Sequence, residues 1–128
     1  MNLFLNGNSL PVQINVCDTY LSRLRGLMFT KQLDRNKGIY IVPCNGIHMY
    51  FMNYAIDVIF IDKDGKVVKT YCNVKQWKLI PYVKRAYGCI EVSVGVIETY
   101  SIQEDMIIEI KWTNNFVSFF ILYFKCGI

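Results

Sequence analysis

Acid–base chemistry in this chain depends on very few side chains. His48 is the only histidine among 128 residues, so a Ser-His-Asp triad or a histidine-rich metal site has a single imidazole to use. Two further candidates, Asp57 and Glu91, are acids that lie inside predicted strands. No nucleophile elbow, phosphate-binding loop or dinucleotide-binding glycine motif is present. The sequence therefore predicts at most a small site built from isolated groups.

Asp57 is the acid in the most apolar surroundings. If residues 56–61 form one strand, Asp57 shares a face with Ile59 and Ile61, because alternate residues of a strand point to opposite faces. Burying a carboxylate without a partner costs several kcal/mol, so a bonded or protonated carboxyl is expected. Its partner is either a loop backbone or an arginine, Arg23 or Arg25. The alternative is that Asp57 is the acid of a ligand pocket.

Glu91 shares its predicted strand face with Cys89 and Ser93, opposite Ile90 and Val92. This arrangement predicts a solvated strand face. The alternative is a carboxylate pair with Asp57, of the kind that glycosidases use.

Cys44, His48 and Met52 follow one another at intervals of four residues. On a helix this spacing would align three metal-ligating side chains. Residues 47–61 are rich in β-forming residues, however, and four residues of strand span about 13 Å. We therefore expect no metal site, and no motif indicates a cofactor.

We predict a small binding or interaction domain, with a pocket around the segment 48–57 and a small molecule or a protein as its partner. The oligomeric state is left open. An enzyme that uses Asp57, His48 or Glu91 as its acid or base is the alternative. The candidate ligand-binding residues are Arg25, His48, Met52, Asn53, Asp57 and Glu91.

A basic stretch, residues 63–85, contains seven lysines or arginines and one acid. Its lysines alternate with Tyr71, Trp77 and Tyr82, the composition of a surface that binds single-stranded nucleic acid. Only one arginine lies in the stretch, and acids follow it directly. We therefore expect a solvated strand and loop here, and keep nucleic-acid binding as a further alternative.

The elements that position these residues are mostly strands. Residues 2–5 and 12–16 are apolar runs on either side of Asn6-Gly7, a hairpin signal. A second hairpin is expected around the turn 62–65, and further strands at 39–42, 47–61, 87–96 and 106–112. Six to eight strands favour an α+β domain, mostly β, built as a compact antiparallel barrel or sandwich.

One amphipathic helix is expected to pack on that sheet. Asp18 or Thr19 can cap it, and its apolar residues recur every three or four positions from Tyr20 to Met28. Gly26 lowers helix stability by about 1 kcal/mol relative to alanine. The helix therefore ends near Gly26, or another backbone approaches there.

Length, composition and cysteine content indicate one folded domain in a reducing compartment. A hydrophobic share of 53 % excludes intrinsic disorder. Five widely spaced cysteines without a signal peptide favour free thiols in the cytoplasm. We expect a single domain over residues 1–112 and an apolar tail over 113–128. Within the tail, the apolar segment Phe116–Phe124 is expected to be a last strand, or else a contact with a membrane or partner.

Four blocks of the sequence resemble a bacterial and archaeal family, domain of unknown function 192. They are residues 24–29 (LRGLMF), 46–53 (GIHMYFMN), 56–62 (IDVIFID), and 90–92 (IEV) with Gly95. The resemblance covers roughly residues 16–110 and implies a compact, largely β domain without an established activity. The family often has tryptophan, proline and proline where this chain has Phe51, Ala55 and Ser93, and many of its members are exported. We take the chain to be a bacterial member.

Overall fold

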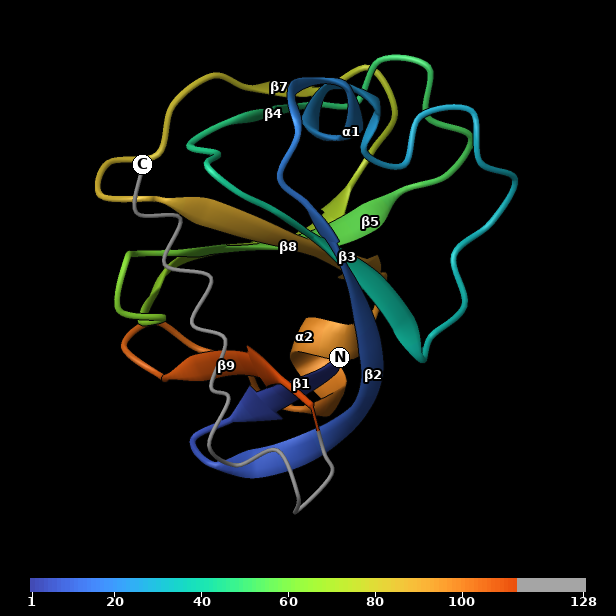
Figure 1. Ribbon diagram of the computed structural model, residues 1–128. Helices are drawn as coiled ribbons and strands as arrows, with labels where there is room; N and C mark the ends of the chain where they lie inside the picture. Colours follow the sequence, from blue (N-terminus) through green and yellow to red (C-terminus); the bar gives the residue numbers. More distant parts are fainter. Residues whose placement is uncertain (113–128) are drawn as a thin grey trace.

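A seven-stranded sheet, a two-stranded sheet and two short helices form the regular structure of residues 1–112, the part of the chain that this computed structural model describes (Figure 1). The strands are β1 Asn2–Leu5, β2 Asn8–Cys17, β3 Lys37–Ile41, β4 Ile47–His48, β5 Ile56–Ile61, β6 Val67–Val74, β7 Leu79–Ile80, β8 Gly88–Ser93 and β9 Ile108–Lys111. The helices are α1 Tyr20–Arg25 and α2 Val96–Thr99. The expected strand or contact segment Phe116–Phe124 lies outside the described residues.

The large sheet has the strand order β6-β5-β8-β3-β2-β1-β9, and β4 pairs with β7. Neighbouring strands are antiparallel except β2 and β3, which are parallel because the segment containing α1 returns the chain to its starting end. The edge strands β6 and β9 are not paired along their length. They meet through a short contact, the bridge between Lys66 and Ile107 and neighbouring backbone hydrogen bonds such as Val67 N–H to Met106 O at 2.9 Å, so the sheet does not close into a barrel. The predicted α+β class with mostly β structure is confirmed.

Both predicted hairpins are present. Asn6 and Gly7 have φ angles of 48° and 84° at the β1–β2 turn, a conformation that asparagine and glycine adopt readily. At the β5–β6 turn, one carboxylate oxygen of Asp62 accepts hydrogen bonds from the backbone N–H groups of Asp64 and Lys66, at 2.8 and 3.0 Å. Local turn chemistry therefore determines the register of these strand pairs.

Apolar side chains fill both faces of the central strands, which explains why β5 and β8 are buried along their whole length. One core lies on the α2 side of the sheet and contains Ile59, Ile90 and Val92. The other lies on the side of α1 and β4 and contains Val58, Phe60 and Cys89. Two acids of these strands, Asp57 and Glu91, therefore enter different cores.

Helix α1 differs from the predicted amphipathic helix. Thr19 caps it, as expected, through a hydrogen bond from the Ser22 backbone N–H to the Thr19 hydroxyl. The helix ends at Gly26, which has a φ of 47°, and none of its own residues is buried. Leu27, the next residue of the apolar pattern, is buried beyond the helix end. Six residues are too few to bury a stripe, so the predicted packing face is wrong.

Helix α2 was not expected, because residues 87–96 read as one strand. The strand ends at Ser93, and Gly95 turns the chain with a φ of 98° before α2 begins at Val96. The turn brings Val96 and Ile97 into the core. Neither this helix nor any other in residues 1–112 is long and apolar enough to cross a bilayer.

Gly46 marks a close approach of two backbones, next to the pocket described below. A Cβ atom at this position would lie 2.6 Å from the Pro81 carbonyl oxygen and 2.7 Å from that of Ile80. We expect Gly46→Ala to lower the free energy of unfolding by about 1–3 kcal/mol, because the β4–β7 pair must shift. Urea denaturation measures this loss. The exposed neighbour Asn45 gives the control, since Asn45→Ala keeps its backbone contact to Val83; equal losses for both variants would contradict the prediction.

Candidate functional site

A small pocket of about 60 Å³ lies between α1 and the sheet. The buried carboxyl of Glu91 on β8 and the side chain of Ile41 on β3 contribute to it from the sheet. The chain from Arg23 to Met28 and the segment around β4 complete the lining. Its side chains with chemical function are Arg23, Arg25, Cys44, His48, Met52 and Glu91.

Glu91 is 5 % exposed. Its neighbours across the sheet are Ile39 on β3 and Val58 on β5. Burial and the nearby Cys44 raise the pKa of Glu91 from 4.5 to about 8, because a desolvated carboxylate is unstable. Within residues 1–112 no hydrogen bond or ion pair satisfies this carboxyl. At neutral pH Glu91 is therefore mostly a protonated group that can both donate and accept a hydrogen bond.

Arg23 brings hydrogen-bond donors to the same pocket. Its Nη1 atom donates to the carbonyl oxygen of Pro43 at 3.3 Å. Its Nε atom is buried, and no acceptor for it exists among the described residues. A buried donor without a partner costs about 1–3 kcal/mol. An acceptor group entering the pocket would recover that free energy.

Aromatic side chains form a continuous cluster beside the pocket, which we call the ring cluster. His48 stacks on Tyr50 at 5.0 Å between ring centroids. The contacts continue from Tyr50 to Trp77 at 6.0 Å, from Trp77 to Phe51 at 5.4 Å and from Phe51 to Phe29 at 5.4 Å. Phe29, Phe51 and Trp77 are each more than half exposed. Exposed aromatic groups in contact with one another are typical of a recognition surface.

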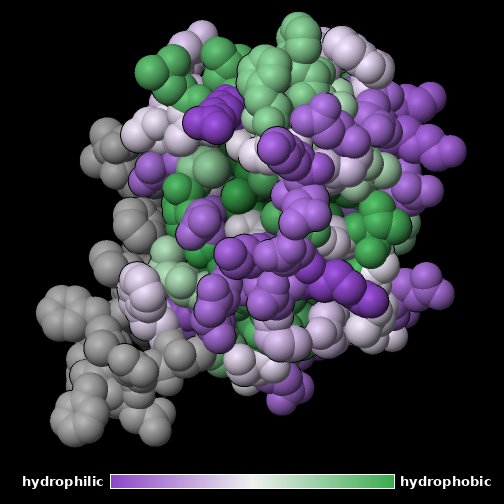
Figure 2. Space-filling model, turned by 90° about the vertical axis from the view of Figure 1, so that its right-hand side faces the viewer, coloured by the Kyte–Doolittle hydropathy of each residue, from purple (hydrophilic) through white to green (hydrophobic). Residues whose placement is uncertain are grey.

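The same three residues have left-handed backbones, with φ angles of 64° for Phe29, 60° for Phe51 and 66° for Trp77. Bulky residues rarely adopt this conformation, which costs about 1–3 kcal/mol each and tends to occur at functional sites. Backbone hydrogen bonds hold them, from Phe29 N–H to Phe51 O and from Trp77 N–H to Met49 O. Figure 2 shows apolar side chains gathered at the upper end of the molecule, which carries α1, β4 and β7 in Figure 1.

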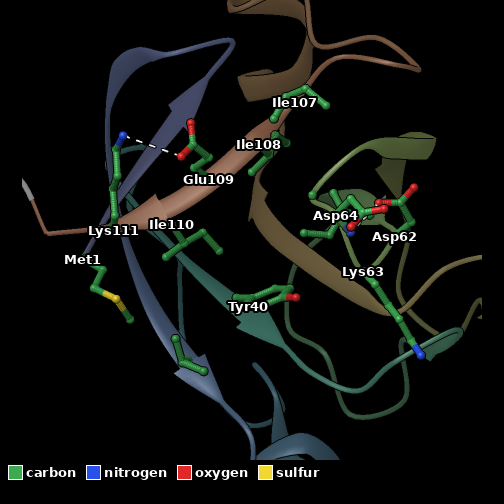
Figure 3. A pocket seen from close by; sticks show the side chains of 13 residues that line it. Met1, Tyr40, Asp62, Lys63, Asp64, Ile107, Ile108, Glu109, Ile110 and Lys111 are labelled. Atoms are coloured by element: carbon green, nitrogen blue, oxygen red, sulfur yellow. Dashed lines mark hydrogen bonds and ion pairs between the residues drawn. The ribbon is translucent and has the colours of Figure 1, made fainter. Parts of the chain in front are cut away.

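A larger cavity of about 350 Å³ lies at the other end, beside β9 (Figure 3). Its lining includes Tyr40 and Ile110, and several of its charged groups have partners. Lys111 pairs with Glu109 at 3.6 Å, and the Asp62 carboxylate accepts two backbone hydrogen bonds. The smaller pocket, by contrast, contains Arg23 Nε, a buried donor that has no acceptor among the described residues, and the buried carboxyl of Glu91. We therefore take the smaller pocket as the candidate site.

Comparison with known proteins identifies the family. The sequence profile of DUF192, described as "Uncharacterized ACR", matches residues 2–110. The chain belongs to the DUF192 family. The predicted resemblance is thereby confirmed, over more of the chain than the four motifs covered.

Curated relatives of this DUF192 chain come from archaea, so the expected bacterial source is not supported. A UPF0127 protein of Thermococcus kodakarensis is 35 % identical over 106 residues, which cover 79 % of this chain and 65 % of that relative. A UPF0127 protein of Pyrococcus horikoshii is 33 % identical over 105 residues, covering 78 % of this chain and 87 % of the relative. The chain thus spans just under two thirds of the length of the first relative.

Two solved structures share the DUF192 fold. A protein of unknown function from Novosphingobium aromaticivorans has a TM-score of 0.75 at 18 % identity, covering 84 % of this chain and 83 % of that one. A chain from Sinorhizobium meliloti, described as a candidate transcription regulator, has a TM-score of 0.75 at 16 % identity, covering 84 % and 91 %. None of these names assigns an enzymatic activity.

The structure brings four of the six predicted ligand-binding residues of this DUF192 protein to the pocket: Arg25, His48, Met52 and Glu91. Asn53 is exposed and donates a hydrogen bond from its amide to the Thr30 carbonyl oxygen at 2.7 Å. It therefore braces the loop that carries Phe29 instead of lining the pocket. Glu91 is buried, so the predicted solvated face is wrong, because the loop containing Gly26 covers that face of β8.

Asp57 lies on the opposite face of the sheet from Glu91. One of its oxygens accepts a hydrogen bond from Asn73 N–H at 2.9 Å. The other accepts from Gly95 and Ile97 N–H at 3.0 and 3.1 Å. The expected loop-backbone partners are present, whereas the expected arginines belong to α1 on the other side. A carboxylate pair with Glu91 is not formed.

Cys44, His48 and Met52 all line the pocket, although strand spacing predicted that they would be far apart. The segment is interrupted after the two residues of β4, and Phe51 turns the chain with its positive φ. No group of three or more metal-ligating side chains of the His, Cys, Asp or Glu type occurs within residues 1–112.

Sequence reasoning missed Arg23 and Phe29 as site residues and included Phe51 only as part of the predicted pocket segment 48–57. The DUF192 motifs around residues 24–29 and 46–53 contain both phenylalanines, so the two blocks could have indicated a shared surface. Nothing in their spacing shows that the blocks meet.

Proposed function

We propose that this DUF192 protein is a non-catalytic ligand-binding domain whose site is the Glu91 pocket together with the ring cluster. The observation that carries this proposal is the set of exposed aromatic residues held in strained left-handed conformations beside a pocket with the buried, unpaired Nε of Arg23. Backbone strain of this kind persists where the surrounding structure holds it in place, and it clusters at ligand-binding and active sites. A site of this kind combines apolar contact area with a few polar groups for orientation.

The chemistry of the lining favours a ligand with an aromatic or apolar body and a small hydrogen-bond acceptor at one end. A cavity of about 60 Å³ admits only such an end group. Protonated Glu91 and the unpaired Arg23 Nε both offer hydrogens to it. The body of the ligand would then lie against Phe51 and Trp77. We propose a small aromatic carboxylate as the ligand class.

The cytoplasm is the compartment that we propose for this function. All four described cysteines are free thiols, Cys17, Cys44, Cys72 and Cys89, as is usual where glutathione keeps proteins reduced.

Nucleic-acid binding is supported by one observation, because Trp77 of the basic stretch belongs to the ring cluster and has Lys75 and Lys78 close to it in sequence. An aromatic surface flanked by lysines suits stacked bases. We treat it as the second candidate, to be decided by the same experiment.

Isothermal titration calorimetry with a panel of aromatic carboxylates, the matching amides and a single-stranded oligonucleotide tests the proposal. We expect a carboxylate to bind, and Trp77→Ala and Phe51→Ala each to weaken binding about tenfold, since a lost aromatic contact is worth about 1 kcal/mol or more. Tyr82 is an exposed aromatic residue outside the cluster, so Tyr82→Ala is the matched control.

Two results would contradict the proposal: no binding by any carboxylate, or equal affinity in the Phe51, Trp77 and Tyr82 variants. Oligonucleotide binding that weakens steeply with salt would favour the nucleic-acid candidate instead.

A further inference from the structure

Two cysteines meet at the edge of the pocket. Cys44 lies in the bend after β3, and Cys89 lies on β8. The Cys89 thiol donates a hydrogen bond to the Cys44 sulfur, with the two Sγ atoms 3.4 Å apart. The backbone N–H of Cys44 donates to the carbonyl oxygen of Tyr87, the residue before β8, at 2.8 Å, so the bend is held next to the start of the strand that carries Cys89.

The two sulfur atoms differ in accessibility. Cys44 is partly exposed and lines the pocket. Cys89 has an exposed fraction of 0 %. A reagent that approaches the mouth of the pocket from solvent therefore meets Cys44 first and can involve Cys89 only afterwards.

Cys44, the more accessible thiol, is also the more acidic of the two. The hydrogen bond from Cys89 lowers the pKa of Cys44 to about 7, with the Arg23 guanidinium acting in the same direction. The shared hydrogen bond and complete burial raise the pKa of Cys89 well above 9. At neutral pH a substantial fraction of Cys44, about half, is therefore thiolate, the nucleophilic form of cysteine. Cys89 keeps its proton until its partner has reacted.

We propose that Cys44 and Cys89 form a dithiol site that reduces small anionic disulfides, with Cys44 as the attacking and Cys89 as the resolving cysteine. Arg23 and Arg25 line the same pocket, so a disulfide with carboxylate groups is favoured over a cationic one. The thiols lie in the same pocket as Glu91 and His48, but the exchange is argued from the cysteines and arginines alone and does not require the ligand proposed above.

The reaction has two steps, and both balance. The Cys44 thiolate attacks one sulfur of the external disulfide, whose S–S bond breaks, and the first thiolate leaves. Cys89 then loses its proton and attacks the Cys44 sulfur, which releases the second thiolate and forms the Cys44–Cys89 disulfide. The external disulfide gains two electrons, the protein dithiol loses two, and the leaving thiolates take up protons from Cys89 and the solvent.

Incubation of the full chain with oxidised glutathione at pH 7, followed by alkylation and mass spectrometry of intact protein and peptides, tests the proposal. We expect the wild type to carry two fewer alkyl groups than the untreated protein and to give a peptide pair joined through Cys44 and Cys89. Cys89→Ser, or Cys89→Ala if the serine destabilises the core, should stop at a glutathione adduct on Cys44. Cys44→Ser should leave Cys89 unmodified.

Two comparisons complete the test. Cys72 is an exposed single thiol on β6 with a raised pKa, so adduct formation at Cys44 should be about tenfold faster at pH 7. The cationic disulfide cystamine should react more slowly with Cys44 than oxidised glutathione does. Tyr82→Ala, at an exposed aromatic residue outside both sites, should leave the exchange unchanged. Disulfide formation is measured without any carboxylate ligand, so failure of this proposal is distinguished from failure of the ligand-binding proposal.

The proposal is overturned if the wild type accumulates a stable adduct on Cys44 without forming the internal disulfide. It is also overturned if Cys44 reacts no faster than Cys72, or if cystamine reacts with Cys44 as fast as oxidised glutathione.

Discussion

Asp57→Ala is expected to lower the free energy of unfolding by about 3–5 kcal/mol, among the largest effects of any single substitution in this chain. The carboxylate is 1 % exposed and accepts three backbone hydrogen bonds. Each buried N–H left without an acceptor costs about 1–3 kcal/mol. Since those N–H groups belong to β6 and to the start of α2, the substitution would free both elements from β5. Urea denaturation followed by circular dichroism measures the loss.

Asp57→Asn sharpens this test because it keeps the shape of the side chain. An amide has one acceptor oxygen and one donor nitrogen, so at least one backbone N–H loses its partner, and a loss of about 1–3 kcal/mol is expected. The control is Asp64→Asn in the exposed β5–β6 turn, which should stay within about 0.5 kcal/mol of the wild type. Full stability of both Asp57 variants would show that these hydrogen bonds do not hold the sheet to α2.

The strand pattern was enough to predict that Asp57 is buried and bonded. The alternation of residues 56–61 places Asp57 among isoleucines, and the cost of burying a bare carboxylate requires hydrogen bonds. The same rule failed for Glu91. Alternation shows which residues share a face of β8, but not that the loop containing Gly26 covers that face. This cover comes from a distant part of the chain.

The ring cluster was beyond prediction for a different reason. Phe29, Phe51 and Trp77 adopt left-handed conformations that their residue types disfavour, so local propensity points away from the observed backbone. In helix α1 the local signal was clear but incomplete. A regular apolar pattern predicted a packing face, but the helix ends at Gly26 and is too short to form one. Local signals thus specified the hairpins and the cap at Thr19, whereas contacts between distant segments decided the site.

Glu91→Gln is expected to remove most of the pH dependence of stability between about pH 5 and pH 8. Glu91 has a pKa of about 8 in the folded chain, against 4.5 as its ordinary value. Between these values the folded chain holds a proton that the unfolded chain has lost, so raising the pH favours unfolding. The wild type should therefore lose about 3 kcal/mol as the pH rises through this range and level off above it. Glutamine stays neutral, so the variant should keep its stability.

Urea denaturation of both proteins at a series of pH values gives the comparison. The two curves should nearly meet at pH 5 and separate steadily up to pH 8. Measuring wild type and Glu91→Gln again in a Cys44→Ser background removes the titrating thiol that contributes to the raised pKa of Glu91. Glu104 is exposed, so Glu104→Gln is the control, and its stability should follow that of the wild type at every pH. Parallel curves for wild type and Glu91→Gln would show that Glu91 is ionised at neutral pH. A carboxylate ligand would then meet a negative charge in the pocket, and the ligand class proposed here would have to change with it.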